Sequence, residues 1–234
     1  MTSKSRKWWW IGGGILVAAF LVAVVAPYVY IHFIEPDPAP KLVVEDAPTV
    51  TTVPNAQRAP LAGTWNITTG SKGQYRVKEV LFGQDSVATG TTTDVTGSMA
   101  IEGTTVQSAK IVVDLTTVKS GRSQRDGQFQ GRIMNTAEFP NATFELTEPI
   151  ALGTEPADGV EIKVNATGNL ALHGTTKSVT TQITAKRTGD TIAASGAIPI
   201  TFSDYGIDDP SGGPATVGDN GTLEFLVVFA PAST

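Results

Sequence analysis

The chain has 234 residues, a net charge of −5 and no cysteine. The lack of cysteine excludes disulfides, thiolate metal sites and a lipid-modified N-terminal cysteine. Residues 1–34 contain three basic residues, Lys4, Arg6 and Lys7, and no acidic one, so the rest of the chain carries a net charge of −8. An acidic body repels phosphate backbones, which argues against binding to nucleic acid.

Residues 8–34 form an almost continuous apolar run, interrupted by three glycines, Pro27 and His32. The run exceeds the roughly 20 helical residues that cross a ~30 Å hydrocarbon layer. A cleaved signal peptide is the alternative, but its apolar part would have only about 7–15 residues and would end in an A-x-A-like site. Basic residues precede the run, and Glu35 and Asp37 follow it. The sequence therefore predicts a single-pass protein of the cell membrane, with a cytoplasmic N-terminus and an extracytoplasmic C-terminal part.

Residues 35–62 are rich in proline and show no apolar period. Proline favours extended polyproline II geometry, which spans about 3.1 Å per residue. We expect residues 35–62 to form a tether up to roughly 80 Å long, between the membrane part (residues 1–34) and a folded domain (residues 63–232).

From residue 63 onward, apolar and polar residues alternate with a period of two. The clearest runs are Ile111, Val113 and Leu115; Phe144 and Leu146; Ile162, Val164, Leu170 and Leu172; and Leu223, Phe225, Val227 and Phe229. Such alternation predicts half-buried strands, and glycine-containing turns separate them at short intervals. The last run is apolar on both faces, because Leu226 and Val228 lie between its members. The pattern indicates an all-β domain, either a sandwich or a barrel.

Three segments resemble the YceI-like family in their order and wording: SQRDGQFQGRIMNTAEFPNATFEL (residues 123–146), GNLALHGTTKSVTTQI (residues 168–183) and FSDYGID (residues 202–208). The resemblance covers roughly residues 63–231. It implies an eight-stranded antiparallel lipocalin-like barrel that holds a long isoprenoid or another lipid. It also implies that residues 119–140, the one break in the strand pattern, form a short helical or loop lid at the tunnel mouth. A barrel of eight strands is filled by its own side chains or holds one small ligand.

The strand phases and the family motifs together select apolar candidates for the tunnel lining. They are Val113, Leu115, Phe129, Phe139, Phe144, Leu146, Val164, Leu170, Leu172, Phe202, Tyr205, Phe225 and Val227. The alternative for each residue is that it only packs against its neighbours in a filled core. Trp65, in a G-x-W sequence like the start of lipocalin barrels, is expected to plug one end.

Arg125 and Asp126 match the family's RD motif. Arg125 is a candidate for a lipid head group, since guanidinium suits phosphate or carboxylate. The alternative is an Arg125–Asp126 bond that pins the lid, or a pair exposed to solvent.

No signature of catalysis or metal binding is present. The predicted extracytoplasmic part has one histidine, His173, which is expected in a turn and has no neighbours with ligand spacing. We therefore predict no enzyme, no catalytic or metal-binding residue and no cofactor. The leading hypothesis is a membrane-anchored protein that sequesters or carries an isoprenoid or fatty-acyl lipid. The alternative is a cell-envelope interaction module with a filled barrel, and pairing as a homodimer is left open.

Overall fold

A computed structural model describes residues 20–48 and 58–232. Within these residues, twelve strands account for most of the fold. They are β1 (Gly63–Ile67), β2 (Lys72–Leu81), β3 (Gln84–Thr92), β4 (Val95–Glu102), β5 (Thr105–Asp114), β6 (Asn141–Leu146), β7 (Ile150–Ala151), β8 (Glu161–Leu172), β9 (Thr175–Thr188), β10 (Thr191–Thr201), β11 (Ala215–Val217) and β12 (Asn220–Pro231).

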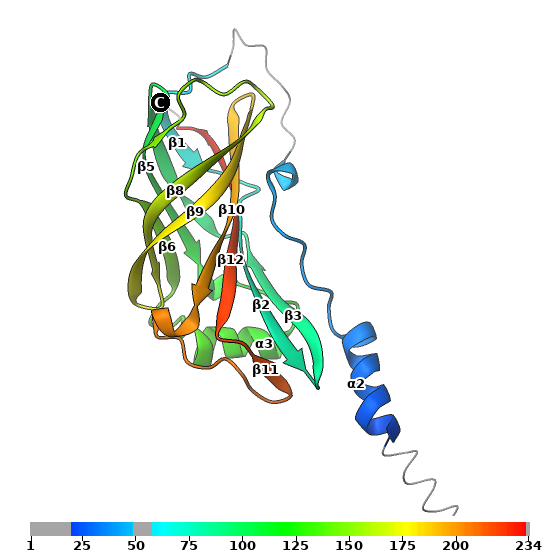
Figure 1. Cartoon of the computed structure of the whole chain (residues 1–234). Helices are drawn as coiled ribbons and strands as arrows, with labels where there is room; N and C mark the ends of the chain where they lie inside the picture. Colours follow the sequence, from blue (N-terminus) through cyan, green and yellow to red (C-terminus); the bar gives the residue numbers. More distant parts are fainter. Residues whose placement is uncertain (1–19, 49–57, 233–234) are drawn as a thin grey trace, which may run out of the picture.

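The strands close into a barrel. Neighbours pair antiparallel in the order β1, β4, β5, β6, β8, β9, β10 and β12, and β12 pairs back with β1, placing Trp65 opposite Pro231. The ring therefore has eight strands, which confirms the predicted barrel and excludes the sandwich (Figure 1).

We call the end of the barrel near α3 in Figure 1 the lower end. A long hairpin, formed by β2 and β3, extends the barrel there. The lower half of β12 pairs with β2, and β2 pairs with β3 along its whole length. The short strand β11 pairs with the outer end of β2, and β7 pairs with β5 near the opposite end.

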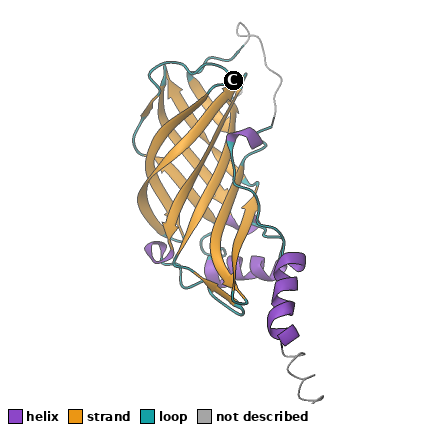
Figure 2. Cartoon of the chain, turned by 45° about the vertical axis from the view of Figure 1, so that its right-hand side comes forward, coloured by secondary structure: helices purple, strands orange, loops and turns teal. Residues whose placement is uncertain are grey.

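Short helical segments lie across this lower end (Figure 2). They are α3 (Ser123–Gln128) and the π-helical turn η6 (Phe129–Ile133), with η5 (Leu115–Thr117) before them and η7 (Phe202–Tyr205) after β10. The segment predicted as a helical or loop lid therefore contains a helix and covers one end of the barrel.

A separate helix precedes the barrel and comprises η1 (Leu21–Val25), α2 (Ala26–Val29) and η2 (Tyr30–Ile34). No helix found in residues 20–48 and 58–232 has the length and apolar character needed to span a membrane. Residues 8–19 of the predicted span lie outside the described residues, so the transmembrane helix stays a prediction.

The described part of the predicted tether lies along the outside of the barrel. Val44, in the 3₁₀ turn η3 (Val44–Asp46), is buried against Ala193 and Leu226. The Gln74 side chain donates a hydrogen bond of 3.0 Å to the Pro40 carbonyl. This packing explains why β12 is apolar on both faces, and it shortens the reach expected of a free tether.

Trp65 is buried in the apolar cluster at the upper end, as expected of a plug, and is only 1% exposed. Its indole N–H donates to the Leu61 carbonyl over 2.9 Å. The Arg187 guanidinium lies over the ring, 5.5 Å from the centroid, which is a cation–π distance.

We predict that Trp65→Ala lowers the free energy of unfolding by roughly 3–5 kcal/mol, because it leaves a large cavity and removes the cation–π contact with Arg187. Urea unfolding followed by far-ultraviolet circular dichroism measures the change. Trp65→Phe is the matched control and should cost less. A loss below about 1 kcal/mol for the alanine variant would contradict the plug role.

Candidate functional site: an apolar bore with a charged mouth

The strand alternation places one apolar phase inside the barrel, where it surrounds open space. The lower cavity has a volume of about 480 Å³ and reaches the lid. A second cavity of about 110 Å³ lies above it. On β8, Ile162 and Val164 line the upper cavity and Leu170 and Leu172 the lower one, as the shared phase predicted.

A waist separates the two cavities. Its members line both cavities and come from four strands: Ile111, Phe144, Ile183 and Phe225. The Phe144 ring lies so close to Gly168 that a Cβ there would be 2.4 Å from Cζ, and the Phe225 ring approaches Gly196 in the same way at 2.6 Å. Glycine permits these close approaches because it has no side chain. The rings therefore lie against the barrel wall.

Most of the predicted lining residues do face a cavity. Val113, Leu115, Phe129, Leu170, Leu172 and Phe202 line the lower cavity; Leu146, Val164 and Val227 line the upper one; and Phe144 and Phe225 line both. Their contact with a ligand stays a prediction.

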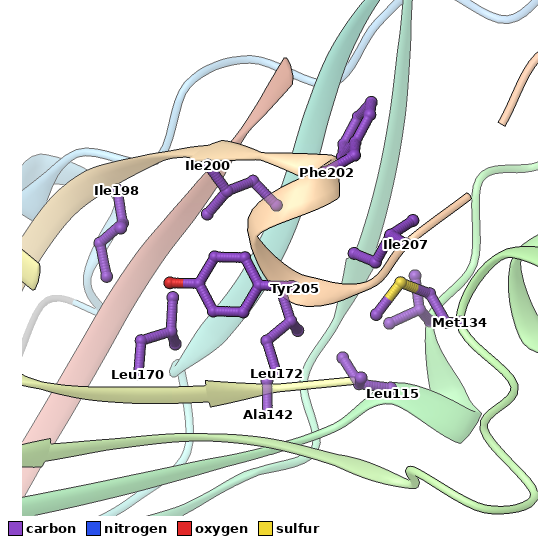
Figure 3. Packing of buried hydrophobic residues seen from close by; sticks show 11 residues of the cluster. Leu115, Met134, Ala142, Leu170, Leu172, Ile198, Ile200, Phe202, Tyr205 and Ile207 are labelled. Carbon is purple, nitrogen blue, oxygen red and sulfur yellow. The ribbon is translucent and has the colours of Figure 1, made fainter. Parts of the chain in front are cut away.

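Phe139 and Tyr205 were also predicted to line the tunnel, but they line neither of these two cavities. Figure 3 shows the Tyr205 ring packed among Leu170, Leu172 and Ile200. Phe139 instead contacts the ring of His173, with centroids 4.8 Å apart. Both aromatic rings are used to pack the lower end of the barrel.

Tyr75 is a lining residue that the sequence did not single out. Its ring stacks on Phe129 of the lid with centroids 5.0 Å apart, and it lies over Gly90 on the neighbouring strand. Burial raises the pKa of its phenol to about 12. Tyr75 and Val77 alternate with polar neighbours, and this pattern could have identified Tyr75 as an inward-facing residue.

Four charged groups meet where the lower cavity reaches the lid: Glu35, Glu79, Arg122 and Arg125. Arg125 Nη2 donates to Glu35 Oε1 (2.8 Å) and to Glu79 Oε1 (3.1 Å). Arg122 binds the other Glu35 oxygen, with Nε–Oε2 at 3.1 Å. Arg122 also donates to the Tyr30 hydroxyl over 2.6 Å. This cluster ties the end of the N-terminal helix to α3, and we call it the mouth cluster.

Arg125 and Asp126 have other partners rather than each other, unlike the Arg125–Asp126 bond that was one of the alternatives. Asp126 Oδ1 instead accepts hydrogen bonds from the backbone N–H and the hydroxyl of Ser120, at 2.8 and 2.6 Å. Asp126 therefore holds the loop before α3, while Arg125 is directed to the cavity mouth.

The described residues contain no group of three or more His, Cys, Asp or Glu side chains arranged for a metal ion. His173 lies with Gly174 in the two-residue β8–β9 turn, as predicted, and both residues have positive φ. Its Nδ1 lies 3.1 Å from the Tyr205 carbonyl oxygen. This position gives His173 a structural role at the turn.

The comparisons with known proteins agree with this geometry. The model of the YceI-like domain matches residues 65–229. The chain belongs to the YceI-like family. UPF0312 proteins of Yersinia pestis and Yersinia pseudotuberculosis are 32% identical over 119 residues, or 50% of this chain and 55% of theirs. The chain therefore spans about half the length of these curated relatives.

Two solved structures resemble the YceI-like barrel. A polyisoprenoid-binding domain from Saccharophagus degradans matches with a TM-score of 0.60 and 18% identity, over 73% of this chain and 99% of the other. BcnA of Burkholderia cenocepacia matches with a TM-score of 0.55 and 23% identity, over 68% and 95% of the two chains. At these identities the likeness shows the fold alone.

The mouth cluster predicts a pH effect through Glu79. Burial raises the pKa of its carboxyl above the ordinary 4.5, although Arg125 acts in the opposite direction. Burying the charged Glu79 carboxylate therefore lowers the free energy of unfolding at neutral pH. This penalty disappears as the pH falls through the raised pKa and the carboxyl becomes protonated. We expect Glu79→Gln to gain stability relative to wild type at neutral pH, with the gain shrinking on acidification toward pH 4.5.

Urea unfolding of both proteins across this pH range measures the difference. Glu145→Gln on the exposed surface is the matched control. A loss of stability for Glu79→Gln at neutral pH that disappears on acidification would mean that the Glu79 pKa is lowered, contrary to this account.

Proposed function

We propose that this YceI-like chain is a membrane-anchored lipid-binding protein, exposed outside the cytoplasm, that holds an isoprenoid or fatty-acyl chain in its bore. The observation that carries the proposal is the apolar cavity of about 480 Å³ with its charged groups gathered at the mouth. This volume falls within the ~300–1,000 Å³ of small-molecule sites. Each buried methylene contributes about 0.8 kcal/mol before the costs of association, so a hydrocarbon tail suits the site best.

The mouth cluster supports an amphipathic ligand rather than a pure hydrocarbon. Guanidinium groups bind phosphate and carboxylate through paired hydrogen bonds, and Arg122 and Arg125 both border the cavity. The tail would then lie toward the waist and the head group near α3. The polyisoprenoid binding of the Saccharophagus degradans domain supports a lipid of this class.

The alternative function, an interaction module with a filled barrel, requires side chains to occupy the bore. The open lower cavity argues against it. The apolar run in residues 8–34 and the basic residues before it support the membrane anchor and its orientation. Pairing as a homodimer stays a prediction. The YceI-like family has a ligand-binding fold and is not a known enzyme family.

The proposal is tested by solvent extraction and mass spectrometry of the full-length protein purified from its native membrane. Leu223 lines the lower cavity, so the larger ring of Leu223→Trp should obstruct it and reduce bound lipid about tenfold, equivalent to about 1.4 kcal/mol. Leu223→Met is the control that keeps the volume. Failure to recover any lipid from wild type, with or without added fatty acid or isoprenol, would refute the proposal.

The waist predicts an upper limit on ligand length. Phe144→Ala removes a ring that borders both cavities and should widen the waist, so the bound lipids should shift to longer chains. The same extraction measures the chain-length distribution. The control is Ala194→Phe, which narrows only the upper cavity and should leave the wild-type distribution unchanged. An unchanged distribution for Phe144→Ala would show that the waist sets no limit.

A further inference from the structure

The N-terminal helix exposes apolar side chains around its whole circumference. No side chain whose burial is described in residues 20–34 is buried, and Phe33 is 78% exposed. The other exposed large apolar residues of this helix are Phe20, Leu21, Val22, Val24, Val25, Tyr28 and Val29. A helix that is apolar all round belongs in a core or in a membrane.

The tip of the β2–β3 hairpin adds a second exposed apolar group beside this helix. Phe82 and Gly83 form its two-residue turn with φ of 50° and 80°, the geometry of a type I′ turn. Asparagine or glycine normally takes the Phe82 position, and a bulky residue there is strained. Phe82 is nevertheless 44% exposed, so core packing does not account for it.

The hairpin tip and the helix form one surface at the mouth of the bore. The rings of Phe82 and Tyr30 meet edge to face with centroids 5.3 Å apart. Tyr30 and Glu35 line the lower cavity, and the mouth cluster fixes both to α3. The helix therefore leaves the barrel at its mouth and runs away from it (Figures 1 and 2).

We propose that residues 20–34 and the Phe82 tip form a bilayer-contact surface that holds the mouth of the bore at the membrane. A lipid then passes between the bilayer and the bore without crossing bulk water. This inference rests on the proposed lipid-binding function and extends it to the route of the ligand. The occupant is a lipid surface rather than a protein, because the exposed helix continues an apolar run that is long enough in sequence to cross a bilayer.

The lack of native cysteine makes a direct test possible with the full-length protein. Phe82→Cys is labelled with the polarity-sensitive dye NBD and reconstituted in vesicles of phosphatidylcholine and phosphatidylglycerol. We expect a blue-shifted emission and strong quenching by doxyl-labelled phosphatidylcholine. Val160→Cys is the matched control, because Val160 is 51% exposed and precedes β8 at the opposite end of the barrel, so its label should stay unquenched.

A second variant tests the route of the ligand. Phe82→Asn suits the type I′ turn and should leave stability unchanged or raised, while it slows transfer of a pyrene-labelled fatty acid from vesicles at least severalfold.

Two results would overturn the membrane-facing mouth. One is an unchanged transfer rate for Phe82→Asn, and the other is quenching of the Phe82→Cys label no stronger than that of the Val160→Cys label. If lipid is still recovered by extraction in either case, the proposed function stands. Strong quenching of the Phe82→Cys label without any recoverable lipid supports the surface and refutes the function.

Discussion

The pairing of β1 with β12 is the constraint on which the rest of the structure depends. Once these strands close the ring, the inward phase of every strand faces one enclosed space rather than a second sheet. Side-chain size then decides how much of that space is filled. Glycines at 168 and 196 let the rings of Phe144 and Phe225 lie against the wall, and open space remains on both sides of the waist.

The two ends of the barrel differ chemically: apolar side chains cover one end, and the other carries charged side chains. Trp65 and its apolar neighbours cover the upper end. The lower end is covered by α3 and η6, and Arg122, just before α3, and Arg125, within it, pair with two carboxylates. The Arg122 and Arg125 side chains keep 26% and 22% of their surface exposed, so a polar head group can reach them, whereas Trp65 at the upper end is 1% exposed. This difference supports the mouth cluster as the entrance for the proposed ligand, and the N-terminal helix ends beside it.

The walls of the barrel could be predicted from local sequence, whereas the mouth could not. Alternation on β8 and β12 identified the inward phase correctly, and the family motifs chose the barrel over the sandwich. The pairing of Glu35 with Arg122 joins residues 87 positions apart, which no local pattern reveals. The Phe82 turn was missed because phenylalanine is not a turn former. The inward face of β12 was ambiguous in sequence because Leu226, on its outer face, is also apolar. The residue that covers Leu226 is Val44, which precedes the barrel in the chain.

The central claim is that the enclosed bore shelters one hydrocarbon chain. Native mass spectrometry of the intact protein, released from detergent micelles, tests it most directly. The account predicts a species heavier than the bare chain by the mass of a single lipid, and conversion to the bare mass when the lipid is dissociated in the gas phase. Detection of the bare chain alone, even after incubation with long-chain fatty acid or isoprenol, would contradict it.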